Sequence, residues 1–372
     1  MIKKLLFFIL FSPAFLIAQI TDSLAFQLGT DLENHLLEGQ LEQTLSLIDE
    51  DVFLDDILIP DLGDGSVKAF NMGFSGAVFD SFFGNIIKEI QKGTSYNFIN
   101  YYPDEAGNYY LVFRFFGDTG ISYHEYVIAD FEGSPKAYDV YVYMSGEFLS
   151  QTMKRVYRST LKEIVKNEEL KFDDAKNLIA FKKIQEAKAY FQKGKYDACL
   201  EIYNSIDTTV RYEKTFLING LLLCPLGYEE QYNEYYEIYA KKYPGDISLF
   251  LLSIDYLISK KDFQGTQNTL DSLAYYTNDD FIDYMKGNIY YLEGDLKKSE
   301  EFYLKALENY PTFLDVYDSL FVVYAEQNNY PRAVFMLEEM RSKFQLKKKE
   351  IVQFVKAEYP GLSESESFSE WK

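Results

Sequence analysis

The chain has 372 residues, 47% of them hydrophobic, and its formal net charge is −21. This length accommodates two ordinary domains, and the hydrophobic content supports packed cores rather than disorder. The acidic balance argues against nucleic acid as a partner, because phosphate binding needs a basic surface, and it argues equally against docking on anionic lipid.

The first 18 residues have the pattern of a cleaved secretory signal. Lys3 and Lys4 form a positive start, residues 5–17 are mainly apolar, and the small residue Ala18 ends the run. This apolar run is too short to span a membrane comfortably, and no second long run follows it. We therefore expect an exported protein, periplasmic or secreted, with no membrane insertion after cleavage of residues 1–18.

Residues 19–147 are predicted to form an α+β domain. Apolar residues at mostly helical spacing predict one helix over 22–48, which Thr21 or Asp22 would cap, and a second helix over 74–93. The period then changes to two, and strong turn signals separate the segments. These features predict an antiparallel meander with strands at 94–102, 108–116, 122–131 and 136–144.

Helices followed by a strongly curved antiparallel sheet resemble the cystatin-type cone of nuclear-transport-factor-like domains. The order of the elements carries this resemblance. The run YHEY…DVYVYMSGEFLSQT within residues 123–152 also resembles exported bacterial proteins of uncharacterised function. Neither resemblance implies a reaction.

Three polar residues on successive predicted strands, Arg114, His124 and Asp139, are the candidates for chemistry in this domain. If they converge inside the cone, they would form a small-molecule-binding or hydrolase-like pocket. The favoured alternative is a buried network of satisfied polar groups. Two isolated histidines and no CxxC motif give no metal-ligand spacing, so no catalytic residue, metal or cofactor is predicted.

Residues 148–177 are predicted to link this domain to a periodic region over 178–345. Steps of 33 or 34 residues in that region connect turns that separate two apolar-periodic helices. The turn positions, which suit a left-handed backbone, are Gly194, Gly227, Lys261, Gly294 and Asn328. The positions seven residues before each turn are Ala187, Gly220, Ile254, Gly287 and Phe321, and those five residues after it are Cys199, Tyr232, Thr266, Ser299 and Ala333.

This pattern resembles the tetratricopeptide repeat, a 34-residue helix–turn–helix unit. Residues 287–311 match its small, aromatic, Gly, small, aromatic, Ala, Pro order closely, and about five units fit the register. The resemblance implies an all-α solenoid in which small residues let the paired helices approach. Tyr232 and Ile254 are bulky where the family prefers small residues, so the helix crossing there is expected to differ.

Two segments follow the repeats. Residues 346–360 are amphipathic and predict a capping helix. Residues 361–372 are polar and acidic and predict a flexible tail, with Phe368 and Trp371 as candidate anchors.

The two cysteines, Cys199 and Cys224, both fall within helical packing patterns. A chain of this size with two cysteines is not a disulfide scaffold. A bridge between them is an open alternative, but two buried small residues are the favoured interpretation.

The family resemblance implies that the first helix of each hairpin lines a concave groove. We expect an exported, non-enzymatic interaction or scaffold protein whose groove binds an apolar segment of a protein or peptide partner. The alternative is that the groove is partly filled by the protein's own segments. Carried over by position, the groove consists of Phe181, Ile184, Lys188, Phe191, Lys214, Leu217, Leu221, Cys224, Ser248, Leu251, Asp255, Ile258, Phe281, Tyr284, Asn288, Tyr291, Asp315, Asp318, Val322 and Ala325.

Overall fold

The computed structural model divides the chain into two compact units. The first unit comprises Met1–Val142 and Glu147–Asp174, and the second comprises Tyr143–Gly146 and Ala175–Lys372. The predicted signal, residues 1–18, lies outside the described residues. The ranges that the structure describes are 20–59, 65–117, 120–131, 133–164, 175–225 and 227–372.

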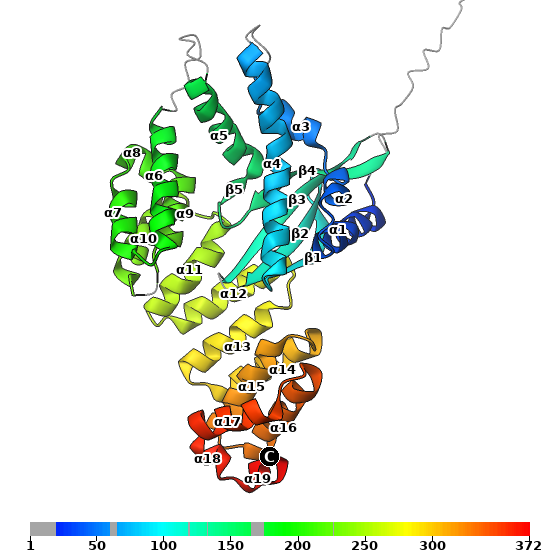
Figure 1. Cartoon of the computed structure of the whole chain (residues 1–372), viewed down its shortest axis with the longest axis vertical. Coiled ribbons are helices and arrows are strands. Elements are labelled where there is room, and N and C mark those ends of the chain that lie inside the picture. Colours follow the sequence, from blue (N-terminus) through cyan, green and yellow to red (C-terminus); the bar gives the residue numbers. More distant parts are fainter. Residues whose placement is uncertain (1–19, 60–64, 118–119, 132, 165–174, 226) are drawn as a thin grey trace, which may run out of the picture. The chain divides into compact units, whose positions relative to one another are not determined.

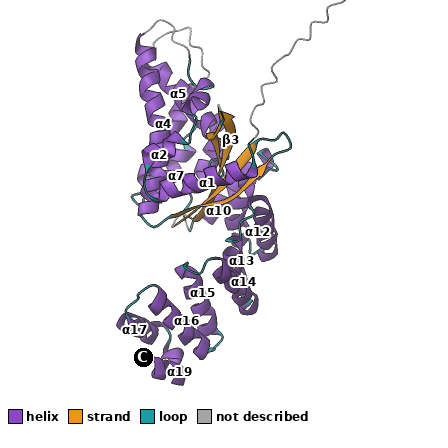
Figure 2. Cartoon of the chain, turned by 90° about the vertical axis from the view of Figure 1, so that its right-hand side faces the viewer, coloured by secondary structure: helices purple, strands orange, loops and turns teal. Residues whose placement is uncertain are grey.

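The first unit contains an antiparallel sheet whose strands follow one another in chain order. Figure 2 shows its strands in orange. Its four longer strands coincide with the predicted segments to within two residues, which confirms the predicted meander. The short last strand was not predicted. The strands are β1 (Ser95–Pro103), β2 (Tyr109–Gly117), β3 (Gly120–Phe131), β4 (Ser134–Val142) and β5 (Glu147–Phe148).

The helices of the first unit differ from the prediction at two places. The single helix expected over 22–48 is broken, because Gly39 adopts a left-handed φ of 71° and the chain turns there. The second long helix begins at Gly65, nine residues before the predicted start at residue 74. The Thr21 side chain accepts the Leu24 N–H and caps the first helix. The helices are α1 (Asp22–Leu37), α2 (Leu41–Ser46), α3 (Glu50–Asp55), α4 (Gly65–Gln91) and α5 (Leu149–Ile164).

Helices α1 and α4 cover one face of this sheet (Figure 1). Leu32 of α1 and Phe83 of α4 are fully buried against Phe113 and Tyr126 of the strands. The rings of Phe83 and Tyr126 are stacked, with centroids 6.2 Å apart. Because strand side chains alternate between faces, this packing fixes which strand residues point toward the helices.

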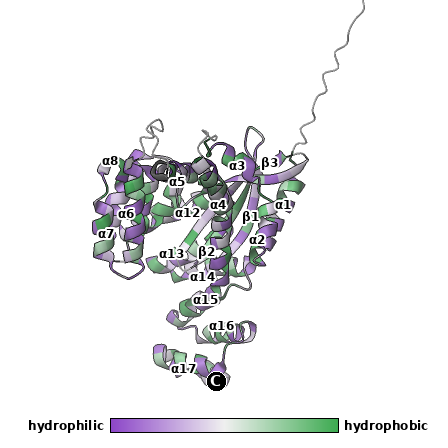
Figure 3. Ribbon diagram, turned by 45° about the horizontal axis from the view of Figure 1, so that its top comes forward, coloured by the Kyte–Doolittle hydropathy of each residue, from purple (hydrophilic) through white to green (hydrophobic). Residues whose placement is uncertain are grey.

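The second unit is built from five helical hairpins, as the periodic pattern predicts. Each pair consists of neighbours in the chain, and a short extra helix lies between the first two pairs. Hydrophobic and hydrophilic residues both occur on α6 and α7 (Figure 3). The pairs are α6 (Ala175–Phe191) with α7 (Tyr196–Asn204), α9 (Lys214–Leu222) with α10 (Glu229–Lys242), α11 (Ser248–Ser259) with α12 (Phe263–Thr277), α13 (Ile282–Glu293) with α14 (Leu296–Asn309), and α15 (Leu314–Glu326) with α16 (Tyr330–Lys343); the extra helix is α8 (Thr208–Arg211).

All five predicted turn positions have the left-handed backbone that closes a helix. Their φ angles are 68° at Gly194, 95° at Gly227, 57° at Lys261, 88° at Gly294 and 55° at Asn328. Glycine adopts this conformation without the steric cost that a side chain brings, so Lys261 is the least suited residue of the five. The shared conformation confirms that the units are repeats of one hairpin.

The small residues of the repeat pattern lie where helices touch. A Cβ added to Gly287 would stand 2.5 Å from the Tyr303 ring, so only glycine fits between these helices. A Cβ on Gly220 would stand 2.3 Å from Tyr203 in the preceding hairpin. Buried tyrosines therefore fill the space that the glycines leave, both within and between hairpins.

The C-terminal segment is helical, which corrects the prediction of a flexible tail over 361–372. Phe368 is fully buried, and the Trp371 indole N–H donates to the Glu338 carboxylate at 2.9 Å. The Lys348 ammonium lies 4.9 Å from the centre of the Trp371 ring. The two aromatic residues anchor this end of the chain, which consists of α17 (Lys348–Glu358), α18 (Pro360–Ser363) and α19 (Glu366–Trp371).

Candidate functional site

Several residues carried over to the groove hold the hairpins together instead of facing a partner. Asn288 accepts a hydrogen bond from the Tyr303 hydroxyl at 2.7 Å. The Tyr284 ring packs against Phe281 and Phe313, with centroid distances of 5.5 and 5.0 Å. The groove residues that are buried are Ile184, Leu217, Leu221, Ser248, Leu251, Phe281 and Ala325.

Other residues carried over to the groove keep accessible surface. Lys188 and Asp255 are exposed, whereas Phe181 and Phe191 are half-buried. Tyr291 is also half-buried, and its hydroxyl donates to the carboxylate of Glu326, in the next hairpin, at 2.5 Å. Partner binding by these residues stays a prediction.

The chain itself occupies one part of the predicted groove. The segment Tyr143–Gly146 belongs to the second unit, and a Cβ on Gly146 would stand 2.6 Å from Lys214 Cε and 2.7 Å from Ile218 Cδ1. The same Cβ would stand 3.0 Å from Ser248 Oγ. The protein's own segment therefore lies against Lys214 and Ser248, and a groove filled by the chain itself stays a prediction.

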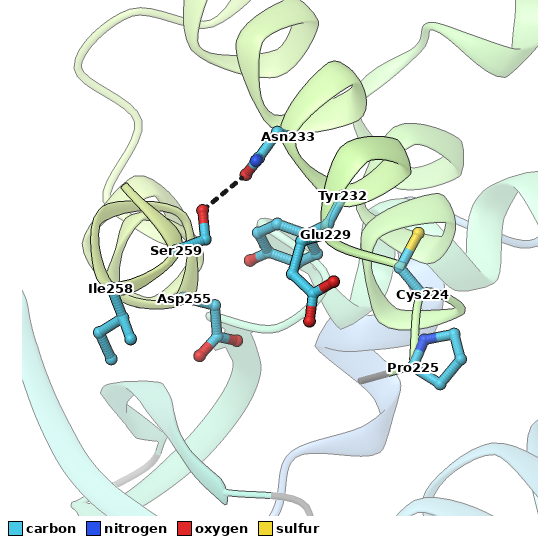
Figure 4. A pocket seen from close by; sticks show the side chains of 8 residues that line it. All are labelled: Cys224, Pro225, Glu229, Tyr232, Asn233, Asp255, Ile258 and Ser259. Atoms are coloured by element: carbon cyan, nitrogen blue, oxygen red, sulfur yellow. Dashed lines mark hydrogen bonds between the residues drawn. The ribbon is translucent and has the colours of Figure 1, made fainter. Parts of the chain in front are cut away.

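A cavity of about 210 Å³ lies between the second and third hairpins. We call it the α10–α11 pocket, after the helices that supply most of its wall. Figure 4 shows side chains from both helices around the central Tyr232 ring, with the carboxylates of Glu229 and Asp255 coming from facing helices. The pocket is lined by Cys224, Pro225, Glu229, Tyr232, Asn233, Asp255, Ile258 and Ser259.

The bulky Tyr232 explains why the pocket forms at this junction. The equivalent residues in the other hairpins, Cys199, Thr266, Ser299 and Ala333, are small and fully buried. Tyr232 instead stays half-buried, and its hydroxyl donates to the Leu252 carbonyl of α11 at 2.7 Å. The Tyr232 ring thus lies between α10 and α11 as part of the pocket wall, at a position where the other hairpins bury a small side chain.

The pocket has an acidic and an apolar part. Hydrogen bonds from the backbone N–H groups of Glu229 itself and Gly227 lower the pKa of the Glu229 carboxyl. Desolvation by the surrounding wall raises the pKa of Asp255, although the residue keeps exposed surface. Ile258 and Pro225 supply apolar wall.

The sequence predicts only some of the residues that line this pocket. Cys224, Asp255 and Ile258 were assigned to the groove by position, whereas Glu229 was not, because it lies on the second helix of its hairpin. The available signal was the bulky Tyr232 at a position where small residues prevail.

The cysteines are two free thiols. Cys199 is buried, and the Cys224 thiol donates to the Gly220 carbonyl at 3.3 Å. Burial, together with the neighbouring Cys199, raises the pKa of Cys224 to about 12. The thiol in the α10–α11 pocket is therefore protonated and is a poor nucleophile at neutral pH.

The structure does not bring the predicted N-terminal trio together. His124 pairs with Phe113 across the β2–β3 ladder and lies on the same, helix-covered face of the sheet. Arg114 follows Phe113 in β2 and pairs with Tyr123, so its side chain points to the other face. Asp139 accepts hydrogen bonds from the Ser150 side chain and backbone, at 2.5 and 3.2 Å. His124 therefore lies on the opposite face of the sheet from Arg114 and Asp139, so the three residues do not share one pocket.

His124 belongs to a buried polar network. Its Nδ1 lies 3.0 Å from the Tyr96 hydroxyl, which in turn lies 2.6 Å from the Tyr126 hydroxyl. Burial lowers the pKa of His124 to about 4, so the imidazole is neutral at pH 7. This geometry agrees with the favoured interpretation, a network of satisfied polar groups.

A second cavity, of about 630 Å³, lies between α3 and α4. Its wall includes Glu50, Asp51 and Asn71 but none of the predicted trio. Within the described ranges, no cluster of three or more His, Cys, Asp or Glu side chains has a metal-binding arrangement. In the same part of the chain, no helix combines the length and the hydropathy that a membrane span requires.

Fold and pocket together define a repeat protein that carries an additional α+β unit. The model of the tetratricopeptide repeat family matches residues 284–313, and the repeat region of this chain is a tetratricopeptide-repeat array. Two solved structures are similar over part of the chain. The crystal structure of PilW, described as a widely conserved type IV pilus biogenesis factor, is 13% identical with a TM-score of 0.41. The structural match covers 52% of this chain and 90% of the PilW chain.

The second structure, MamA AMB-1, is 12% identical with a TM-score of 0.33 and covers 48% of this chain and 98% of MamA. No curated protein sequence matches this chain. The resemblance of the first unit to cystatin-type cones stays a prediction.

Proposed function

We propose that this protein is a non-enzymatic interaction protein whose repeat region binds an extended segment of a partner protein at the α10–α11 pocket. The observation that carries this proposal is an accessible cavity between two hairpins of a tetratricopeptide-repeat array. Stacked repeats present continuous surfaces, and such surfaces commonly serve binding.

The chemistry of the described residues supports binding rather than catalysis. His124 is neutral and buried, and its ring is hydrogen-bonded to the Tyr96 hydroxyl. Arg114 lies on the opposite face of the sheet. Cys224 is protonated and has no histidine beside it in the pocket wall. An activated nucleophile needs an adjacent base or a lowered pKa, and neither is found at this thiol.

We also propose that the protein acts after export, in the periplasm or outside the cell. The sequence pattern of residues 1–18 supports this proposal. Intact-mass measurement of the protein recovered from outside the cytoplasm would show loss of this segment. Recovery of that protein with residue 1 still present would contradict export by signal cleavage.

Site-specific photocrosslinking in the producing cell tests the binding proposal. A photoreactive phenylalanine analogue replaces exposed Ser259 at the pocket rim or, as the control, exposed Glu308 on α14, outside the pocket wall. We expect one partner protein to crosslink from position 259 and not from position 308. Equal labelling from both positions, or no adduct from position 259, would contradict binding at this pocket.

A further inference from the structure

We propose that the α10–α11 pocket receives a lysine or arginine side chain from an extended segment of the partner. This inference rests on the proposed function, because it names the chemistry of the segment that the repeat region binds. It follows from the size of the cavity, from its mixed wall and from its two carboxylates.

The size of the pocket suits one long side chain. Sites for drug-sized ligands typically measure about 300–1,000 Å³, whereas this cavity measures about 210 Å³. The Tyr232 ring, Ile258 and Pro225 offer apolar surface along which the methylene stem of a basic residue can lie. The Ser259 hydroxyl donates to Asn233 Oδ1 at 3.1 Å and braces the two helices at the rim.

The carboxylates supply the complementary charge. Glu229 and Asp255 come from facing helices, and both line the pocket (Figure 4). Across the described ranges, neither carboxylate forms an ion pair with a lysine or an arginine of the chain. A desolvated carboxylate gains most from a cation that brings its own hydrogen-bond donors.

The surrounding charges favour approach of a basic group. Exposed Glu230 and Glu234 add negative charge to α10 beside the pocket. Lys260 and Lys261, at the end of α11, are the nearest opposing charges along the chain, and the Lys260 ammonium lies 5.2 Å from the centre of the Tyr256 ring. An acidic cleft attracts a cationic segment and repels an acidic one.

Other occupants fit this wall less well. An acidic side chain would face two carboxylates, and an apolar one would desolvate them without compensation. The partner segment is therefore expected to place Lys or Arg at this point.

A peptide library tests this inference with the full chain. The probe is a set of fluorescent undecapeptides whose central residue is Lys, Arg, Gln or Glu and whose flanking residues are randomised. Wild-type protein is expected to enrich peptides with central Lys or Arg by about tenfold or more over Gln. The double variant Glu229→Gln/Asp255→Asn is expected to lose this preference.

The matched control is Glu308→Gln/Glu370→Gln, which removes two exposed carboxylates outside the pocket wall. It should keep the wild-type preference. Binding of peptides with no preference for the central residue would overturn the basic-side-chain inference and leave the proposed function standing. Absence of any peptide binding would count against both. An equal loss of preference in the pocket variant and the control would assign the effect to net charge and overturn the inference.

Discussion

At the scale of single residues, the contact between Gly287 and Tyr303 shows how the repeat pattern arises. The sequence predicts a small residue at position 287, and the structure shows that an added Cβ would meet the Tyr303 ring at 2.5 Å. The repeat period predicts the position of this contact. It does not predict how close the contact is, because that distance depends on the tyrosine of the second helix.

Gly287→Ala is therefore expected to lower the free energy of unfolding by up to about 2 kcal/mol. The overpacking penalty of roughly 1–3 kcal/mol exceeds the gain in helix propensity, which is about 1 kcal/mol. Urea unfolding followed by circular dichroism measures the change.

Gly73→Ala in α4 is the matched control. No atom lies within 4 Å of a Cβ at Gly73, so the same substitution should stabilise by about 0.5–1 kcal/mol. A stabilising effect at Gly287 would contradict the packing described here.

His124 predicts a dependence of stability on pH. The folded state holds its pKa near 4 and the unfolded state near 6.5, so the unfolded chain binds more protons between these values. The contribution of His124 to the free energy of unfolding is fully present above pH 6.5. It is lost as the pH falls toward 4, by roughly 3 kcal/mol in all. Urea midpoints measured between pH 7 and pH 5 should fall for the wild type and stay flatter for His124→Gln. Parallel curves for the two proteins would contradict a buried neutral imidazole.

At the scale of elements, the sequence predicts the five hairpins and the four long strands because both rest on repeated spacing. It places helix ends less well. The left-handed turn at Gly39 and the early start of α4 at Gly65 depend on tertiary packing, which overrides local helical spacing. Tertiary packing also explains why residues 361–372 are helical and not flexible. Phe368 and Trp371 pack against the last repeat, and this burial stabilises a segment whose composition is polar.

The hairpin turns give a pair of opposite predictions. Lys261 adopts φ 57° where glycine would be unstrained, so Lys261→Gly should raise the unfolding free energy by about 0.5–1 kcal/mol. Gly294 has φ 88°, so Gly294→Ala should lower it by about 1 kcal/mol. Thermal unfolding of both variants measures the two shifts. A destabilising Lys261→Gly would contradict a common left-handed turn.

At the scale of the whole molecule, the sequence predicts the class of protein better than the place where it acts. Repeat spacing identifies the array, but the groove residues were carried over by position alone. Tyr232 is half-buried and lines the pocket, whereas Leu217 and Leu221 are buried in the core of the repeats. In the first unit, the predicted trio is divided because His124 lies on the opposite face of the sheet from Arg114 and Asp139, and residue type alone does not predict the face.

Hydrogen exchange of the full chain, with and without the crosslink-identified partner, tests the central claim most directly. We expect partner-dependent protection to concentrate in residues 229–233 and 255–259, the parts of α10 and α11 that contribute to the wall of the α10–α11 pocket. Protection confined to the sheet and helices of residues 22–164, with the pocket segments unchanged, would contradict the account.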